Sequence, residues 1–332
     1  MTGSDKPKIV VLGAGSWGTA LANVAARAGA SVWLWARDPA HAAAMAADRE
    51  NRKRLPGVAL ESSVIPTSEV AVVGEADILL AVAPAQAVRQ LCVVLRPVVR
   101  AGTPIALCAK GIERGTGLFL SDVVRDCLPD NPPAILSGPS FATDVARGLP
   151  TAVTLAAGDD ALARRIVAAL GVPSFRLYHS TDVRGVEIGG AAKNVLAIAC
   201  GIAAGRGLGS SAGAALVARG FAELTRFGRA FGAKPDTLMG LSGLGDLVLT
   251  CGSAQSRNFS LGLALGRGES VENASGGKLA EGAFTASVLV EMSNRMGVEM
   301  PISRSVDDVL AGRMSVAEAI EALLMRPSKS EI

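Results

Sequence analysis

A lysine inside an apolar segment is the residue whose setting most clearly suggests chemistry. Between Glu187 and Arg206 the sequence carries one charged residue, Lys193, among Ala, Gly, Leu and Ile. Burial strips an ammonium of its hydration, so a buried lysine gives up its proton more readily and can act as general acid and base. The alternative is a lysine whose long stem reaches from the helix to the surface. We expect no membrane span, because the run is short and an ammonium at its centre is costly in lipid.

Two further groups in the second half could take part in chemistry. Asp246 stands in a glycine-rich apolar segment at 240–248, which we interpret as a loop, and it either joins the chemistry or caps the next helix. Ser256, Arg257 and Asn258 bring together a hydroxyl, a guanidinium and an amide. This combination suits a phosphate, since arginine offers a bidentate donor. A polar helix entry is the alternative.

A glycine pattern near the N-terminus indicates a dinucleotide site. Gly13, Gly15 and Gly18 directly follow an apolar run at 8–12 and precede a helical pattern at 19–28. In this context the first glycine permits a tight turn, the second lets a pyrophosphate approach the backbone, and the third packs helix on strand. The helix N-terminus offers amides and a partial positive charge to the phosphates.

Other candidates stand where predicted strands end. Arg37 follows the second strand, where an arginine can pair with the 2′-phosphate of NADP, so we expect NADP or NAD as cofactor. Lys110 follows a strand at 104–109 and is placed for a nicotinamide or an anionic substrate. Gly138 and Ser140 follow a strand at 134–137, in a turn suited to an anion or a hydroxyl. Arg37 could instead be an exposed turn arginine, and Lys110 could be a solvated lysine.

The elements that must position these residues fall into two groups. Strand-like runs at 8–12, 31–35, 77–83, 104–109, 134–137, 151–156 and 174–178 alternate with helical patterns, including one at 41–54. From about residue 181 helical patterns dominate. We therefore predict an α/β protein with an N-terminal Rossmann-like doubly wound sheet and an all-α C-terminal domain. The predicted domains are a dinucleotide-binding domain at 1–180 and a helical substrate-binding domain at 181–332.

Composition excludes several classes of function. The 332 residues carry a net charge of +3 with no basic run, so no nucleic-acid partner is expected. The N-terminus lacks the apolar core of a signal peptide, and the five scattered cysteines suit free buried thiols, which together predict a cytoplasmic protein. With two histidines no metal site is expected. The helical domain could form a homodimer.

The whole chain resembles the bacterial NAD(P)-dependent glycerol-3-phosphate dehydrogenases. The matching motifs occur in the family's order from the N-terminus to about residue 301; residues 207–212 depart from it because they lack an expected asparagine. The motifs are Gly13-Ala14-Gly15-Ser16-Trp17-Gly18, Lys110-Gly111-Ile112-Glu113, Leu136-Ser137-Gly138-Pro139-Ser140-Phe141-Ala142, Gly185-Val186-Glu187 with Lys193-Asn194, Gly243-Leu244-Gly245-Asp246-Leu247 and Ser256-Arg257-Asn258.

This resemblance implies an oxidoreductase that interconverts dihydroxyacetone phosphate and sn-glycerol 3-phosphate, which feeds phospholipid synthesis. It implies catalytic roles for Lys193, as proton donor and acceptor, and for Asp246 and Lys110. The substrate-contacting positions implied are Lys110, Gly138, Ser140, Lys193, Asp246, Ser256, Arg257 and Asn258. The cofactor-contacting positions implied, beside the three glycines, are Ser16, Trp17, Arg37, Lys110, Ala142, Arg257, Leu279 and Glu281.

Two other functions fit parts of the pattern. A dehydrogenase of similar architecture acting on a β-hydroxy acid would need a carboxylate-binding arginine, and would not need the Ser256-Arg257-Asn258 motif. A non-catalytic dinucleotide sensor would keep the glycine pattern without a buried lysine.

Overall fold

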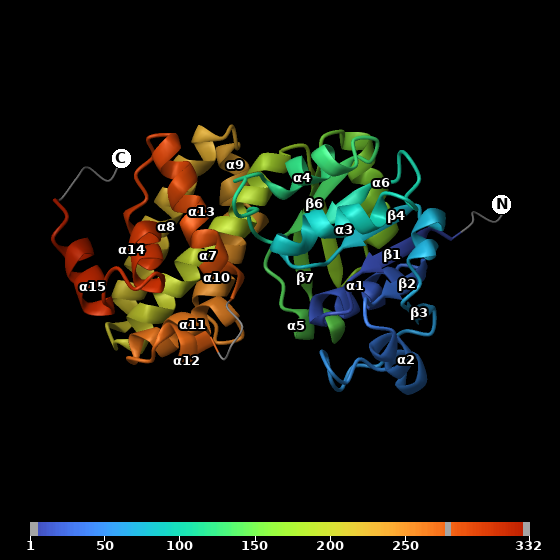
Figure 1. The fold of residues 1–332 in the computed structure, drawn as a ribbon, viewed down its shortest axis with the longest axis horizontal. Coiled ribbons are helices and arrows are strands. Elements are labelled where there is room, and N and C mark those ends of the chain that lie inside the picture. The colour runs from blue at the N-terminus through green and yellow to red at the C-terminus, as the bar shows by residue number, and fades with distance from the viewer. Residues whose placement is uncertain (1–5, 276–279, 328–332) are drawn as a thin grey trace. The chain divides into compact units, whose positions relative to one another are not determined.

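The chain divides into two compact units. The computed structural model describes residues 6–275 and 280–327. One unit draws on Met1–Lys110 and Leu118–Glu187, and the other on Gly111–Gly117 and Ile188–Ile332. Figure 1 shows the sheet in the first and the helices of the second. The short segment 111–117 therefore belongs with residues that follow it by more than seventy positions.

The first unit is built on one eight-stranded sheet. Its order is β3-β2-β1-β4-β5-β6-β7-β8, and every neighbouring pair is parallel except β6 and β7. The predicted Rossmann-like sheet is confirmed, but the reversal at β7 was not predicted. The strands are β1 (Lys8–Leu12), β2 (Ser31–Trp35), β3 (Val64–Thr67), β4 (Ile78–Ala81), β5 (Ile105–Leu107), β6 (Pro133–Ser137), β7 (Thr151–Ala157) and β8 (Phe175–Ser180).

Each face of the sheet is covered by its own hydrophobic core, because side chains alternate along a strand. On β1, Ile9 and Val11 enter one core, and Val10 and Leu12 enter the other. The first core is completed by α1 (Ser16–Arg27), α2 (Pro39–Asp48), α5 (Ala142–Ala146) and α6 (Asp160–Leu170). The second is completed by α3 (Val88–Leu95), α4 (Leu120–Cys127) and the start of α7 (Val183–Gly205).

The prediction of one helix across 41–54 was wrong at its end. Helix α2 stops at Asp48, and Arg49 takes a left-handed conformation with φ of 52°. The Arg49 guanidinium donates to the carbonyls of Glu61 and Val64 at 2.6 and 2.9 Å. These long-range bonds turn the chain toward β3, a strand that the sequence analysis did not identify.

Every secondary-structure element in the described part of the second unit is helical. After α7 come α8 (Gly209–Ala230), α9 (Pro235–Met239), a π-helical turn (Leu241–Gly245), α10 (Asp246–Cys251), α11 (Arg257–Gly266), α12 (Val271–Ser275), α13 (Glu281–Arg295), α14 (Pro301–Leu310) and α15 (Val316–Leu324). The predicted all-α region is confirmed.

Helices α7 and α11 pack backbone against backbone. A Cβ added to Gly201 would lie 2.1 Å from the Phe259 carbonyl oxygen, and one added to Gly262 would lie 2.1 Å from that of Ile198. Gly205 and Gly266 repeat this contact one turn further along. Glycine is therefore required at these positions so that the two helices can approach closely. This close contact sets the register of α7 along α11.

Helix α7 is apolar all round because it lies inside the protein. Among the described residues it is the one helix long and apolar enough to cross a membrane, yet 89% of its apolar window is buried within the molecule. Such burial is typical of a core helix.

Candidate active site

The glycine turn after β1 has the shape that its sequence indicates. Gly13 has φ of +124°, and a Cβ there would lie 2.9 Å from the Val82 carbonyl oxygen. A Cβ on Gly18 would lie 1.8 Å from the Gly13 carbonyl oxygen. These two glycines hold strand, turn and helix α1 in contact, and no larger residue fits either position.

Gly15, in contrast to Gly13 and Gly18, faces open space. It is the N-cap of α1, and a Cβ at this position would meet no atom within 4 Å. Its φ of −79° and ψ of −179° are open to any residue, so the glycine is not explained by backbone conformation. Free space beside a helix N-terminus suits a phosphate. Ser16 and Trp17 begin α1 next to this space, so the residues present fit the dinucleotide that the pattern predicts.

Lys110, Gly138 and Ser140 converge at the same edge of the sheet. Lys110 follows β5 and Gly138 follows β6, and these strands are parallel neighbours. The Gly138 carbonyl oxygen accepts hydrogen bonds from Lys110 Nζ at 3.0 Å and from Ser140 Oγ at 3.1 Å. Gly138 has φ of +151°, and a Cβ there would lie 2.8 Å from Val153 Cα. Ala142 is the first residue of α5, which begins just beyond this turn.

Arg37 lies at this edge too, but outside that cluster. It is exposed after β2, and Asp38 beside it caps α2 by accepting from the Ala40 amide at 3.0 Å. Within 6–275 and 280–327 the Arg37 guanidinium forms no ion pair. It is therefore available to a ligand phosphate.

Lys193 is buried and is bonded to two side chains of α10. Only 5% of Lys193 and 1% of Asp246 are exposed. Lys193 Nζ lies 2.6 Å from Asp246 Oδ1 and donates to Thr250 Oγ1, also at 2.6 Å. The Thr250 hydroxyl in turn donates to the Asp246 carbonyl oxygen at 2.6 Å. The ammonium is thus held in one position by a carboxylate and a hydroxyl.

The segment around Asp246 is not the loop that we expected. Residues Leu241–Gly245 form a π-helical turn that leads directly into α10, and Asp246 is the first residue of that helix. A Cβ on Gly243 would lie 1.9 Å from the Leu238 carbonyl oxygen, and one on Gly189 of α7 would lie 2.6 Å from that of Ser242. The glycines allow the turn to press against α7, which brings Asp246 to Lys193.

Ser256, Arg257 and Asn258 start helix α11. Ser256 is its N-cap, and its Oγ accepts from the Phe259 amide at 3.2 Å. Arg257 is exposed at the first helical position, whereas Asn258 is buried and accepts from the Gly282 amide at 2.9 Å. Arg257 is therefore the exposed member of this motif, and Asn258 joins α11 to α13.

The last two predicted cofactor contacts are Glu281 and Leu279. Glu281 is the first residue of α13 and is partly buried. Leu279 lies outside the described residues.

The cysteines are free and buried, as predicted. The Cys251 thiol donates a hydrogen bond to the Cys200 sulfur beside Lys193 and Asp246, and this bond together with burial raises the pKa of Cys251. Burial raises the pKa of Cys108 to about 12. Cys251 and Cys108 are therefore poor nucleophiles, because the thiolate is the reactive form.

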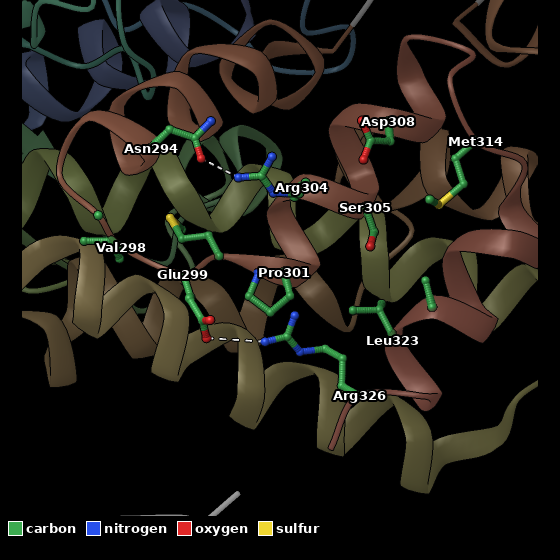
Figure 2. A pocket seen from close by; sticks show the side chains of 13 residues that line it. Asn294, Val298, Glu299, Pro301, Arg304, Ser305, Asp308, Met314, Leu323 and Arg326 are labelled. Atoms are coloured by element: carbon green, nitrogen blue, oxygen red, sulfur yellow. Dashed lines mark hydrogen bonds and ion pairs between the residues drawn. The ribbon is translucent and has the colours of Figure 1, made fainter. Parts of the chain in front are cut away.

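A surface pocket of about 440 Å³ in the second unit contains none of the predicted site residues. Figure 2 shows its arginines engaged, Arg304 with Asn294 and Arg326 with Glu299. It is lined by residues of 294–326 from α13, α14 and α15 and the segments beside them. The predicted chemistry therefore does not depend on this pocket.

One functional candidate was missed in the sequence. Thr250 lies four residues after Asp246, which places both on one face once α10 is known to be a helix. The i, i+4 spacing was a readable signal for Thr250, but it was hidden by the interpretation of the segment as a loop.

The fold and these two groups of residues define an NAD(P)-dependent dehydrogenase. A dinucleotide-type glycine turn opens the sheet unit, and a buried lysine held by an aspartate lies in the helical unit.

The comparisons with known proteins define the family. Residues 8–163 match the family model described as NAD-dependent glycerol-3-phosphate dehydrogenase N-terminus, and 182–321 match the corresponding C-terminus. The chain is 65% identical over 324 residues to a glycerol-3-phosphate dehydrogenase [NAD(P)+] of Azorhizobium caulinodans, with 98% of each chain covered. A relative of that name from Beijerinckia indica is 62% identical, again with 98% of each covered.

A solved structure agrees. The crystal structure of glycerol-3-phosphate dehydrogenase from Coxiella burnetii is 40% identical, with a TM-score of 0.92, covering 97% of this chain and 99% of that one. This chain belongs to the NAD-dependent glycerol-3-phosphate dehydrogenase family.

Proposed function

We propose that this protein reduces dihydroxyacetone phosphate to sn-glycerol 3-phosphate with NAD(P)H, and catalyses the reverse reaction. Family membership supports the activity, since two relatives that match along 98% of their length are named glycerol-3-phosphate dehydrogenase [NAD(P)+]. The observation that carries the chemistry is the buried ammonium of Lys193, bonded at 2.6 Å to both Asp246 and Thr250. The proposed role is supply of glycerol phosphate for phospholipids, in the cytoplasm.

The chain's own residues handle the proton and the charge. When bound, NAD(P)H supplies the hydride. Negative charge then develops on the carbonyl oxygen of the substrate, where the Lys193 ammonium stabilises it and delivers a proton. In the reverse direction the neutral amine accepts the proton of the alcohol. Asp246 and Thr250 hold the nitrogen in place through their two bonds at 2.6 Å.

We assign binding of the dinucleotide to the domain at 1–180 and binding of the substrate mainly to that at 181–332. Gly13, Gly15, Ser16, Trp17 and Gly18 would hold the pyrophosphate region. Arg37 would pair with the 2′-phosphate of NADP. The proposed remaining cofactor contacts are Lys110, Ala142, Arg257, Leu279 and Glu281.

The phosphate of the substrate would be held chiefly by Arg257, with Ser256 and Asn258 shaping the helix start from which it projects. The remaining substrate contacts proposed are Lys110, Gly138, Ser140, Lys193 and Asp246. Binding energy from the phosphate would fix the ketone in position for reaction. A homodimer is also part of the proposal, tested by the mass of the protein in solution.

The experiment is oxidation of NADPH, followed by absorbance, on addition of dihydroxyacetone phosphate to the pure protein. We expect rapid oxidation with the phosphorylated ketone and little with dihydroxyacetone. Arg257→Ala should raise KM for the phosphorylated ketone by about 10-fold or more, because a charge-assisted bond is lost. Equal rates with the two ketones would contradict the assignment of a phosphate site, and no oxidation at all would contradict the activity.

A further inference from the structure

We infer that Asn51 is a positioning residue for the cofactor, which aims the backbone amides of the glycine turn at the dinucleotide phosphates. This inference rests on the proposed placement of the dinucleotide at that turn. Asn51 is fully buried, 32 residues after Thr19 in the chain, and no motif of the sequence drew attention to it.

The Asn51 side chain holds the turn through two donated hydrogen bonds. Its Nδ2 donates to the Ala14 carbonyl oxygen at 3.1 Å and to Thr19 Oγ1 at 2.7 Å. The Thr19 hydroxyl passes the interaction on by donating to the Gly15 carbonyl oxygen at 2.9 Å. The Ala14 carbonyl is thereby drawn to the interior side by the Asn51 amide, and the Gly15 carbonyl is held there by the Thr19 hydroxyl together with the Thr19 backbone N–H, which donates to it at 3.0 Å.

The direction of every bond in this network is fixed. Because both protons of Asn51 Nδ2 face acceptors, Oδ1 must be the acceptor for the third partner, His41 Nε2, at 2.9 Å. His41 therefore carries a proton on Nε2. A buried network in which each donor meets an acceptor is rigid. If the Asn51 amide were rotated by 180°, its oxygen would face the Ala14 carbonyl oxygen and that pair would lose its hydrogen bond.

The consequence for a ligand follows from peptide geometry. In a planar trans peptide the carbonyl of one residue and the N–H of the next point in opposite directions. Drawing the Ala14 and Gly15 carbonyls inward therefore turns the Gly15 and Ser16 amides outward. In the described part of the chain neither amide donates to a protein acceptor. The space beside Gly15 is open, so these amides are directed to where a phosphate fits.

The test is Asn51→Asp, which keeps the shape but removes both donated protons. We expect the Kd for NADPH to rise by about 10- to 100-fold, the loss typical of a misdirected bond to a charged group. The KM for dihydroxyacetone phosphate and kcat at saturating NADPH should stay near those of the unchanged protein. A purely structural residue would not produce this split.

Asn131→Asp is the matched control. Asn131 is 3% exposed in the same unit, and its Nδ2 also donates to two backbone carbonyls, of Arg100 at 2.8 Å and of Thr103 at 2.9 Å. It does not contact the glycine turn, so this variant should lose comparable stability with an unchanged Kd for NADPH. An equal rise in Kd in both variants would overturn the inference.

Two further variants keep the test decisive. Thr19→Val breaks the relay to Gly15 and should weaken NADPH binding, whereas Thr19→Ser retains the hydroxyl and should restore it. Gly15→Leu fits the backbone conformation but fills the open space, and should weaken binding strongly. If Gly15→Leu binds NADPH normally, the placement of the cofactor at the turn is wrong. If it binds poorly while Asn51→Asp and Thr19→Val bind normally, only the role of Asn51 is refuted.

Discussion

Replacement of Lys193 by methionine should separate its contribution to catalysis from its contribution to the fold. Methionine has a similar length and fits an apolar setting. The variant removes the ammonium that lies 2.6 Å from the Asp246 carboxylate, and Asp246 is 1% exposed. Removing one member of a buried ion pair costs about 3–5 kcal/mol of folding stability. Loss of the proton donor should lower kcat by about 100-fold or more.

The double variant Lys193→Met with Asp246→Asn distinguishes the two effects. It removes the uncompensated charge, so stability measured by urea or thermal unfolding should recover in large part. Activity should not recover, because the proposed proton carrier, Lys193, is still absent. Binding of NADPH should be retained in both variants and serves as the control for folding.

Two results would refute this reasoning. A kcat for Lys193→Met within about 3-fold of the unchanged protein would exclude Lys193 as the proton carrier. Recovery of activity in the double variant would show that the single variant failed through instability alone. An unchanged unfolding midpoint in the single variant would mean that Asp246 does not need its ion-pair partner.

Three other predictions follow from contacts in the two units. Thr250→Val keeps the shape but removes the second acceptor of Lys193 Nζ, so kcat should fall about 10-fold with no change in the Kd for NADPH, measured by steady-state rates and direct binding. Arg37→Ala should raise the KM for NADPH by about 10-fold and that for NADH much less; equal changes would exclude a contact with the 2′-phosphate. Burial raises the pKa of Glu187 above its usual 4.5, against the opposing effects of Arg184 and Ser121. As pH falls, the Glu187 carboxyl therefore takes up its proton at a higher pH in the folded chain than in the unfolded chain. At neutral pH the buried carboxylate lowers the folding stability. That stability is regained as pH falls through the folded pKa toward 4.5. The test compares the unfolding free energy of Glu187→Gln with that of the unchanged protein, measured by denaturant titration at a series of pH values. The variant's advantage should shrink from about pH 7 toward pH 4.5, and a constant difference would contradict the raised pKa.

Much of the first unit could be predicted because its signals are local. The run before Gly13 is apolar over the last four of the five residues of β1, and the glycines follow at once. Strands β1, β2, β4 and β5 were placed within a residue or two because a buried parallel strand is a short unbroken apolar run, whereas β3 was missed. The turn at Arg49 was missed since its cause lies in carbonyls twelve and fifteen residues away, which no local pattern reveals.

The sequence alone determined that the segment around Lys193 would be buried, and it predicted a buried lysine as one of two alternatives. A run of Ala, Gly, Leu and Ile with a single ammonium can reach low energy only by packing on all sides, and the structure leaves 5% of that lysine exposed. The same local reasoning identified Gly13, Gly15 and Gly18, whose neighbours in the chain form the elements that they join. A residue can be identified in this way when its role depends on the residues next to it in the chain.

Only the tertiary structure decided what holds these groups. Thr250 reaches Lys193 from 57 residues away, and Asn51 reaches Ala14 from 37 away. A threonine or an asparagine has the same local preferences whether or not it meets a distant carbonyl, so its sequence context carries no sign of the contact. Such bonds exist because glycines and small side chains let helices and turns approach closely, and the angle of that approach is set by the packing of the whole unit.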